Sequence, residues 1–377
     1  MLTAAGLFGA NPAPAAPHLP ASDAEVLAEL PAGARHADLV AQRLVRDRLD
    51  VTLPLARFYI TRARATGDLR FLGLAQQTLK PWLDRAPSSV DALVLDATRR
   101  QSLHEFAAAL AELDRVIEVR PGDPQAWLTR ATVLRVLGRY PDAAQACGHL
   151  AVDALPAVGD LCLESIRGLS GHLSGAYQAV VALSSQELPP EARAWRYSEL
   201  GEMAARLGDD VAAEHWLREG LVVAPEDSYT RAALADLWLR LRRAREAEEL
   251  LAGHDSMEPL LLRVAIAERQ LHDPAADAAE RRLAEAFEVE ARRGEAVHRR
   301  EYARFLLDVR GQPEAALRAA QENWQVQHEP DDVLILLRAA RAAHRPAAAA
   351  PALEFLAAHG LEDARLADYG YVAGRRK

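Results

Sequence analysis

The sequence predicts an all-α fold in which tandem helical hairpins stack into a right-handed superhelical α-solenoid of about eight or nine hairpins. Three observations lead to this prediction. Alanine, the strongest helix former, occupies 77 of the 377 positions. Helical periodicity runs from about residue 37 to about residue 367 without strand-like alternation of useful length. A two-helix pattern recurs about every 34 residues, which is typical of stacked repeats.

The clearest hairpin lies between residues 192 and 225. Small residues at Gly201 and Ala213 allow its two helices to approach closely, and Gly208 permits a tight turn between them. Pro225 ends the second helix because proline has no amide proton for a helical hydrogen bond. Neither helix can bury its apolar face alone, so the hairpin requires similar neighbours on both sides.

Two segments carry a resemblance to a known family. The pattern W-x2-R-A-x2-L-x3-G-R-Y-x2-A over residues 127–143, and Leu200-Gly201 followed by alanine and proline at matching spacing, resemble tetratricopeptide repeats. The chain is also similar to uncharacterised exported bacterial proteins of this class. A departure occurs at Arg242, where the pattern expects a turn glycine. The resemblance is clear over 90–156 and 192–251, weaker over 50–87, 157–189 and 297–330, and marginal over 258–294.

The chain divides into a leader and one repeat array. Residues 1–35 are rich in proline and alanine, and we expect a flexible leader that resembles the end of a secretory signal without its basic start. We expect residues 36–377 to form a single solenoid with a capping hairpin at 331–377 and a long second helix near 274–293. The leader favours export to the periplasm; the alternative is a cytoplasmic protein.

Composition and motifs argue against several functions. The net charge of −9 argues against a general affinity for nucleic acid, and no apolar run approaches the roughly 20 residues of a membrane span. The sequence contains no phosphate loop, no nucleophile elbow and no histidine pair at helical spacing. We therefore expect no enzyme activity, no cofactor and no metal. Isolated helical histidines such as His149, His172 and His215 are expected to be partly buried spacers.

The two cysteines lie on neighbouring helices. Cys147 and Cys162 are about equally far from a turn centred near Ala154 and Leu155, so antiparallel helices would bring their side chains together. They are either a disulfide, which would indicate an oxidising compartment, or two buried thiols at a helix contact.

The resemblance implies that the first helix of each hairpin lines a concave surface. The lysine and asparagine clamp that some family members use for a C-terminal carboxylate is absent, because Val94, Thr98, Leu128 and Thr132 stand at its positions. Trp195 and Tyr229 either face a bound peptide or pack between hairpins. The concave positions that the resemblance implies are Thr98, Gln101, Gln125, Thr132, Arg135, Trp195, Glu202, Arg206, Tyr229, Asp236 and Arg240.

The resulting functional hypothesis is a non-catalytic scaffold or adaptor that binds a protein or peptide partner in its concave groove. One alternative is a regulatory module that senses a small ligand in the groove. Another is a structural protein that self-associates through the marginal unit at 258–294. Nothing in the sequence specifies the partner or the oligomeric state.

Overall fold

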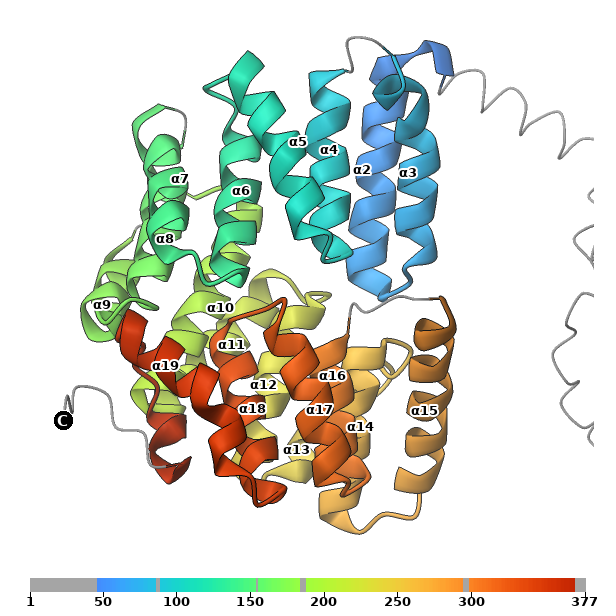
Figure 1. Ribbon diagram of the computed structural model, residues 1–377, viewed down its shortest axis with the longest axis vertical. Helices are drawn as coiled ribbons and strands as arrows, with labels where there is room; N and C mark the ends of the chain where they lie inside the picture. Colours follow the sequence, from blue (N-terminus) through green and yellow to red (C-terminus); the bar gives the residue numbers. More distant parts are fainter. Residues whose placement is uncertain (1–45, 86–88, 154, 184–187, 294–297, 370–377) are drawn as a thin grey trace, which may run out of the picture.

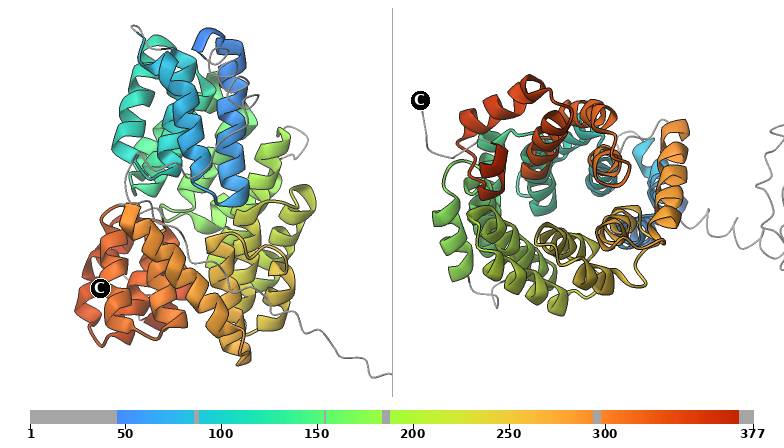
Figure 2. Two further views of the ribbon diagram at one scale, coloured as in Figure 1. Left: turned by 90° about the vertical axis from the view of Figure 1, so that its right-hand side faces the viewer. Right: turned by 90° about the horizontal axis from the view of Figure 1, so that it is seen from below.

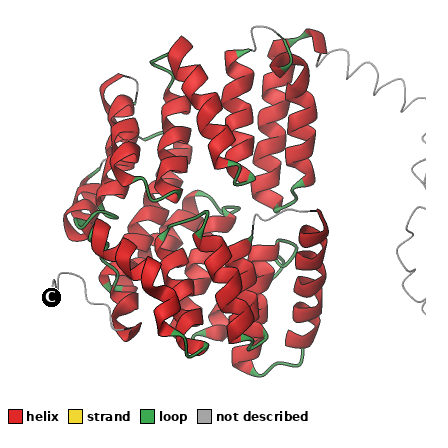
Figure 3. Cartoon of the chain, viewed as in Figure 1, coloured by secondary structure: helices red, strands yellow, loops and turns green. Residues whose placement is uncertain are grey.

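A computed structural model describes residues 46–85, 89–153, 155–183, 188–293 and 298–369, and all regular secondary structure within these ranges is helical (Figure 3). No helix among the described residues combines the length and apolarity that a membrane crossing requires. The predicted leader at 1–35 and the last eight residues of the predicted capping hairpin lie outside the described ranges.

The described helices form nine successive hairpins (Figure 1). The first helices of the hairpins are α2 (Leu49–Thr66), α4 (Val90–Ser102), α6 (Pro124–Val136), α8 (Pro156–Arg167), α10 (Pro190–Leu207), α12 (Ser228–Arg240), α14 (Glu258–Leu271), α16 (Arg299–Arg304, extended by a π-helix over Phe305–Val309) and α18 (Pro330–Ala342). The second helices are α3 (Arg70–Leu83), α5 (Phe106–Val119), α7 (Tyr140–Asp153), α9 (Leu173–Ala182), α11 (Asp210–Val223), α13 (Ala244–Leu251), α15 (Ala276–Arg293), α17 (Pro313–Trp324) and α19 (Ala350–His359).

Helix starts follow local capping chemistry. The carboxylates of Asp123, Asp209 and Asp227 each accept a hydrogen bond from the backbone amide three residues later, which satisfies an amide that has no partner within the helix. Proline occupies the first turn of α6, α8, α10, α14, α17 and α18, where its missing amide proton costs nothing.

Every one of the nine hairpin turns contains a residue with a left-handed backbone, at φ between 55° and 81°. Glycine supplies this conformation in five turns, and a residue with a Cβ atom supplies it in the other four. Arg242, which departs from the repeat pattern, takes the same conformation with φ 62°. The turn therefore keeps its shape although the favoured glycine is missing. In chain order the nine residues are Gly67, His104, Gly138, Gly171, Gly208, Arg242, His272, Gly311 and His344.

Close packing within a hairpin depends on small residues. A Cβ atom added to Gly201 on α10 would lie 2.5 Å from Cγ of Leu217 on α11, which confirms the predicted close approach of these helices. The prediction of a long second helix in the seventh hairpin is also confirmed, because α15 spans 18 residues whereas α13 spans eight.

The hairpins wind into a ring. Each first helix contacts the first helix of the next hairpin, so the first helices form a continuous inner layer and the second helices lie outside it (Figure 2, right). The winding exceeds one turn, and the early hairpins α2–α7 come to lie over the late hairpins from α14 onward (Figures 1 and 2). The observed fold is the predicted all-α solenoid, closed on itself.

A seam of contacts joins the two turns of the solenoid. The backbone amide of His328 donates to the carbonyl oxygen of Val136 at 2.8 Å, and the amide of Leu173 donates to Glu362 at 2.8 Å. The side chains of Gln327 and His104 are joined by a hydrogen bond of 2.9 Å. These contacts connect the second, third and fourth hairpins to the last two.

The C-terminal segment packs against an earlier hairpin. After α19 the chain forms a 3-10 helix over Ala364–Tyr369, which contacts both α18 and α10 of the fifth hairpin. Leu361 and Leu366 are fully buried there. Burial of the two leucine side chains stabilises the packing of this segment against α18 and α10.

Candidate functional site

The candidate site is the inner face of the ring. All eleven positions predicted for the concave surface lie on four first helices: α4, α6, α10 and α12. These helices belong to the inner layer (Figure 2), but the side chains of the eleven residues do not all meet.

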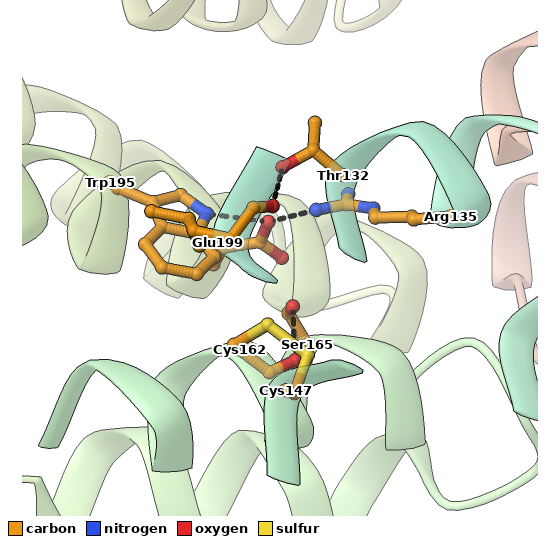
Figure 4. The surroundings of a disulfide bond; sticks show 8 residues. Thr132, Arg135, Cys147, Cys162, Ser165, Trp195 and Glu199 are labelled. Carbon is orange, nitrogen blue, oxygen red and sulfur yellow. Dashed lines mark hydrogen bonds and ion pairs between the residues drawn. A yellow bond between two sulfur atoms is a disulfide. The ribbon is translucent and has the colours of Figure 1, made fainter. Parts of the chain in front are cut away.

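Glu199 on α10 is the centre of the first cluster on this face. Its Oε1 atom accepts a hydrogen bond from Trp195 Nε1 at 2.9 Å and a second one from Arg135 of α6, on the opposite side (Figure 4). Arg135 also lies 3.8 Å from Glu202 and 3.9 Å from Glu329 of the ninth hairpin. One guanidinium group therefore faces three carboxylates from two turns of the solenoid.

Tyr229 and Glu202 form the accessible part of this cluster. The Tyr229 hydroxyl donates a hydrogen bond to Glu202 Oε1, and 54% of Tyr229 is exposed to solvent. Burial and the nearby Glu199 carboxylate raise the pKa of Glu202 to about 7, against the pull of Arg135. Near neutral pH, Glu202 therefore exchanges between its protonated and ionised forms, and an additional positive charge nearby would favour the ionised form.

Asp236 on α12 is the centre of a second cluster. Its carboxylate receives hydrogen bonds from Arg263 on α14 at 2.6 Å and from Arg304 on α16 at 2.7 Å. Burial alone would raise the pKa of Asp236, but the two guanidinium groups hold it well below its usual range. Asp236 is fully engaged in linking three consecutive hairpins.

Other predicted positions do not join these clusters. Arg206 is buried and donates to the carbonyl oxygen of Gly168 at 2.8 Å, and Arg240 pairs with Asp210 at the start of α11. The hydroxyls of Thr98 and Thr132 bond to carbonyl oxygens of their own helices, and Gln125 donates to Thr129. Gln101 is half-buried near the end of α4.

Several residues of the clusters were not among the predicted positions. Glu199 lies one helical turn after Trp195, and this spacing could have identified it as a partner of the indole nitrogen. Arg263, Arg304 and Glu329 belong to hairpins in which the repeat resemblance is marginal or weak, so no position could be transferred to them.

Cys147 on α7 and Cys162 on α8 form a disulfide, with Cα atoms 5.5 Å apart (Figure 4). Both residues are buried, and the Ser165 hydroxyl donates to the carbonyl oxygen of Cys162 at 2.8 Å. Of the two arrangements left open by the sequence, the structure has the disulfide, which fastens the third hairpin to the fourth.

A separate cluster combines two glutamates and a histidine. Nδ1 of His298 lies 2.7 Å from Glu290 and 3.3 Å from Glu258. Burial opposes a charged imidazole, but hydrogen bonds with both carboxylates raise the pKa of His298 to about 10. The three residues line a pocket of about 470 Å³.

Comparison with protein-family models and with curated proteins gives no match. Solved structures do match. A chain of the APC/C hetero-tetramer Cut9–Hcn1 aligns over 86% of this chain and 62% of its own length, with 15% identity and a TM-score of 0.52. A thermophilic TPR protein of Thermus thermophilus aligns over 48% of this chain and 98% of its own, with 23% identity and a TM-score of 0.42. A tetratricopeptide repeat protein of Parabacteroides merdae aligns over 76% of this chain and 99% of its own length, with 12% identity and a TM-score of 0.37.

The Cut9–Hcn1 alignment spans most of the described residues, and the repeated hairpins with left-handed turns agree with it. The chain therefore has the tetratricopeptide-repeat fold.

Proposed function

We propose that the protein is a non-catalytic scaffold that binds an extended segment of a partner protein on the inner face of its ring. The observation that carries the proposal is the exposed Tyr229 beside Glu202. Large aromatic side chains with a polar end are favoured at protein interfaces, and an inner layer of parallel first helices offers a long, continuous surface.

The charges on this face favour a basic partner segment. Glu199 and Glu202 share Arg135, so a lysine or arginine of the partner would supply the positive charge that the pair lacks. Most other charges on the inner face are already paired within the protein, as Asp236 is with Arg263 and Arg304. Specific binding would therefore concentrate at Tyr229 and Glu202.

The proposal can be tested by affinity capture from an extract of the source cells. The bait proteins are wild type, Tyr229→Ala, Glu202→Gln, and a control, Val211→Ser, whose side chain is 82% exposed at the start of the outer helix α11. We expect a protein that wild type and the control retain and that both inner-face variants lose. Asp236 is unsuitable for this test because its replacement would leave the buried Arg263 and the half-buried Arg304 without this carboxylate.

Equal capture by all four baits would contradict the inner-face assignment. Capture of no protein by folded wild type, together with thermal stabilisation by a small molecule, would instead favour the sensing alternative. Circular dichroism spectra of the four baits establish that they are folded alike.

We also propose that the protein works in an oxidising compartment, namely the bacterial periplasm. The Cys147–Cys162 disulfide and the signal-like leader support this proposal. Cell fractionation with immediate thiol blocking tests it: the protein should appear in the periplasmic fraction with both cysteines unmodified. Two alkylated cysteines in a cytoplasmic fraction would contradict it.

A further inference from the structure

We propose that Glu258, Glu290 and His298 form a binding site for one divalent transition-metal ion of the Zn²⁺ class. This inference is independent of the proposed partner binding, because the three residues lie on the seventh and eighth hairpins, whereas Tyr229 lies on the sixth. Glu258 is the first residue of α14, Glu290 lies near the end of α15, and His298 precedes α16.

The three side chains converge as metal ligands do. One ligand atom from each residue lies within 4.8 Å of the other two, and each side chain is only partly accessible, with 14% to 17% exposed. One imidazole nitrogen with two carboxylate oxygens is a donor set that suits Zn²⁺ and its neighbours in the first transition series. Mg²⁺ and Ca²⁺ prefer sites made of oxygen atoms alone.

Hydrogen bonding alone does not satisfy this cluster. Nδ1 of His298 carries at most one proton, yet carboxylate oxygens from both Glu258 and Glu290 approach it. Glu258 Oε1 is inaccessible to water, and its contact with His298 Nδ1 is 3.3 Å long, against 2.7 Å for the contact that Glu290 makes with the same nitrogen. A divalent cation placed among the three ligand atoms would give each of them a partner and would balance the two negative charges.

The surroundings leave room for further ligands. The pocket of about 470 Å³ next to the cluster is lined by residues of α15 and by the turn of the first hairpin, Gly67–Leu69. Its basic side chain, Arg282, is engaged by Asp255 at 2.6 Å. Three protein ligands facing a pocket leave coordination positions for water or for a small anion.

A bound ion would also hold neighbouring helices together. The site joins the start of α14, the end of α15 and the start of α16, and it borders the turn between α2 and α3. A bound ion would therefore fix the seventh and eighth hairpins to each other at the place where the first hairpin lies over them.

The test uses full-length protein treated with a chelator and then titrated with ZnCl₂ by calorimetry and with CoCl₂ by visible absorbance. We expect calorimetry to show one Zn²⁺ bound per chain. We expect the CoCl₂ titration to show the visible absorption bands of Co²⁺ that is bound by protein ligands. Glu290→Gln and His298→Gln should each weaken Zn²⁺ binding by more than about tenfold, the loss that even an outer-shell partner can cause. The control, His215→Ala, removes a histidine of α11 that is exposed and not partly buried as predicted, and this variant should bind as wild type does.

Two results would overturn the proposal. The first is a folded wild-type protein that gives neither Zn²⁺ binding heat nor cobalt bands, which would mean that the cluster holds only a shared proton. The second is Zn²⁺ binding that both ligand variants retain, which would place the ion elsewhere. The wild-type cobalt spectrum decides the first point even if a variant fails to fold.

Discussion

The Tyr140 hydroxyl donates a hydrogen bond of 3.2 Å to the carbonyl oxygen of His328, a residue 188 positions later in the chain. The Tyr140 ring is fully buried and meets Phe355 and His359 edge-on. This contact joins the third hairpin to the eighth and ninth, and it belongs to the seam that closes the solenoid into a ring. Closure brings Arg135 near Glu329, so the candidate binding face includes residues from both turns of the solenoid.

Gly138 is the seam residue whose replacement should be most harmful. It has φ 71°, and an added Cβ atom would lie 2.6 Å from the Phe355 ring. We expect Gly138→Ala to lower the free energy of unfolding by roughly 2 kcal/mol or more, because the methyl group strains the backbone and displaces the ring. Urea denaturation measures the change.

The control for this prediction is Gly148→Ala in α7, where an added Cβ atom meets nothing within 4 Å. This change should be neutral or stabilising by about 0.5–1 kcal/mol, because alanine favours the helix. Equal stability of the two variants would show that the turn at Gly138 does not lie against Phe355.

The disulfide should contribute measurably to stability. Cys147 and Cys162 close a loop with a sequence separation of 15, for which the loss of chain entropy in the unfolded state corresponds to about 3 kcal/mol. We expect reductant to lower the urea midpoint of wild type. The Cys147→Ala, Cys162→Ala double variant should unfold at a lower urea concentration than oxidised wild type, both with and without reductant. An identical wild-type midpoint with and without reductant would contradict the prediction.

His104 should make stability depend on pH. Burial and the nearby positive charges of His298, Arg299 and Arg300 lower the pKa of His104 to about 4, although Glu301 opposes them. The folded protein favours the neutral ring. The contribution of His104 to the free energy of unfolding is therefore complete above pH 6.5 and is lost as the pH falls toward 4. The loss should reach roughly 1–3 kcal/mol.

The comparison variant for His104 is His104→Asn, because asparagine tolerates the left-handed backbone of this position, φ 58°, and does not titrate. Thermal unfolding with a chelator present, between pH 7 and pH 4, should show a steeper loss of stability for wild type than for His104→Asn. Parallel curves for the two proteins would contradict the lowered pKa of His104 in the folded protein.

Arg242 carries avoidable backbone strain. Its side chain is exposed and its φ is 62°, a conformation that costs a residue with a Cβ atom about 1–2 kcal/mol. We expect Arg242→Gly to raise the free energy of unfolding by about 0.5–1 kcal/mol after the greater flexibility of unfolded glycine is deducted. The matched control, Arg245→Gly within α13, should lower it by about 1 kcal/mol. If Arg242→Gly and Arg245→Gly both lowered the free energy of unfolding, the result would contradict the left-handed backbone of Arg242.

The hairpins could be predicted from the sequence because their signals are local. Gly201, Gly208 and Pro225 determine the packing, the turn and the end of one hairpin within 25 residues. Helical periodicity predicts where the helices themselves lie. At His104, Arg242, His272 and His344 a residue other than glycine takes the left-handed turn. Such a substitution hides the turn in the sequence and leaves the backbone unchanged.

Ring closure and the full candidate site could not be predicted in this way. The seam depends on the summed rotation of successive hairpins, and no short motif encodes the contact between Tyr140 and His328. The resemblance could place Tyr229 and Glu202 on the inner face, but it gave no sign that Glu329 would approach Arg135 from the next turn. It also treated Asp236 as a free contact, whereas Arg263 and Arg304 engage it.

The most direct test of the central claim is site-specific photo-crosslinking in the source cells, with p-benzoylphenylalanine in place of Tyr229 or, as the control, in place of Val211. The crosslinker at position 229 would stand on the inner face and at position 211 on the outer helix α11. If the inner face binds a partner segment, position 229 should yield one discrete covalent adduct that position 211 does not yield, and mass spectrometry of the adduct should find a basic segment. A discrete adduct at position 211 and none at position 229 would contradict the claim.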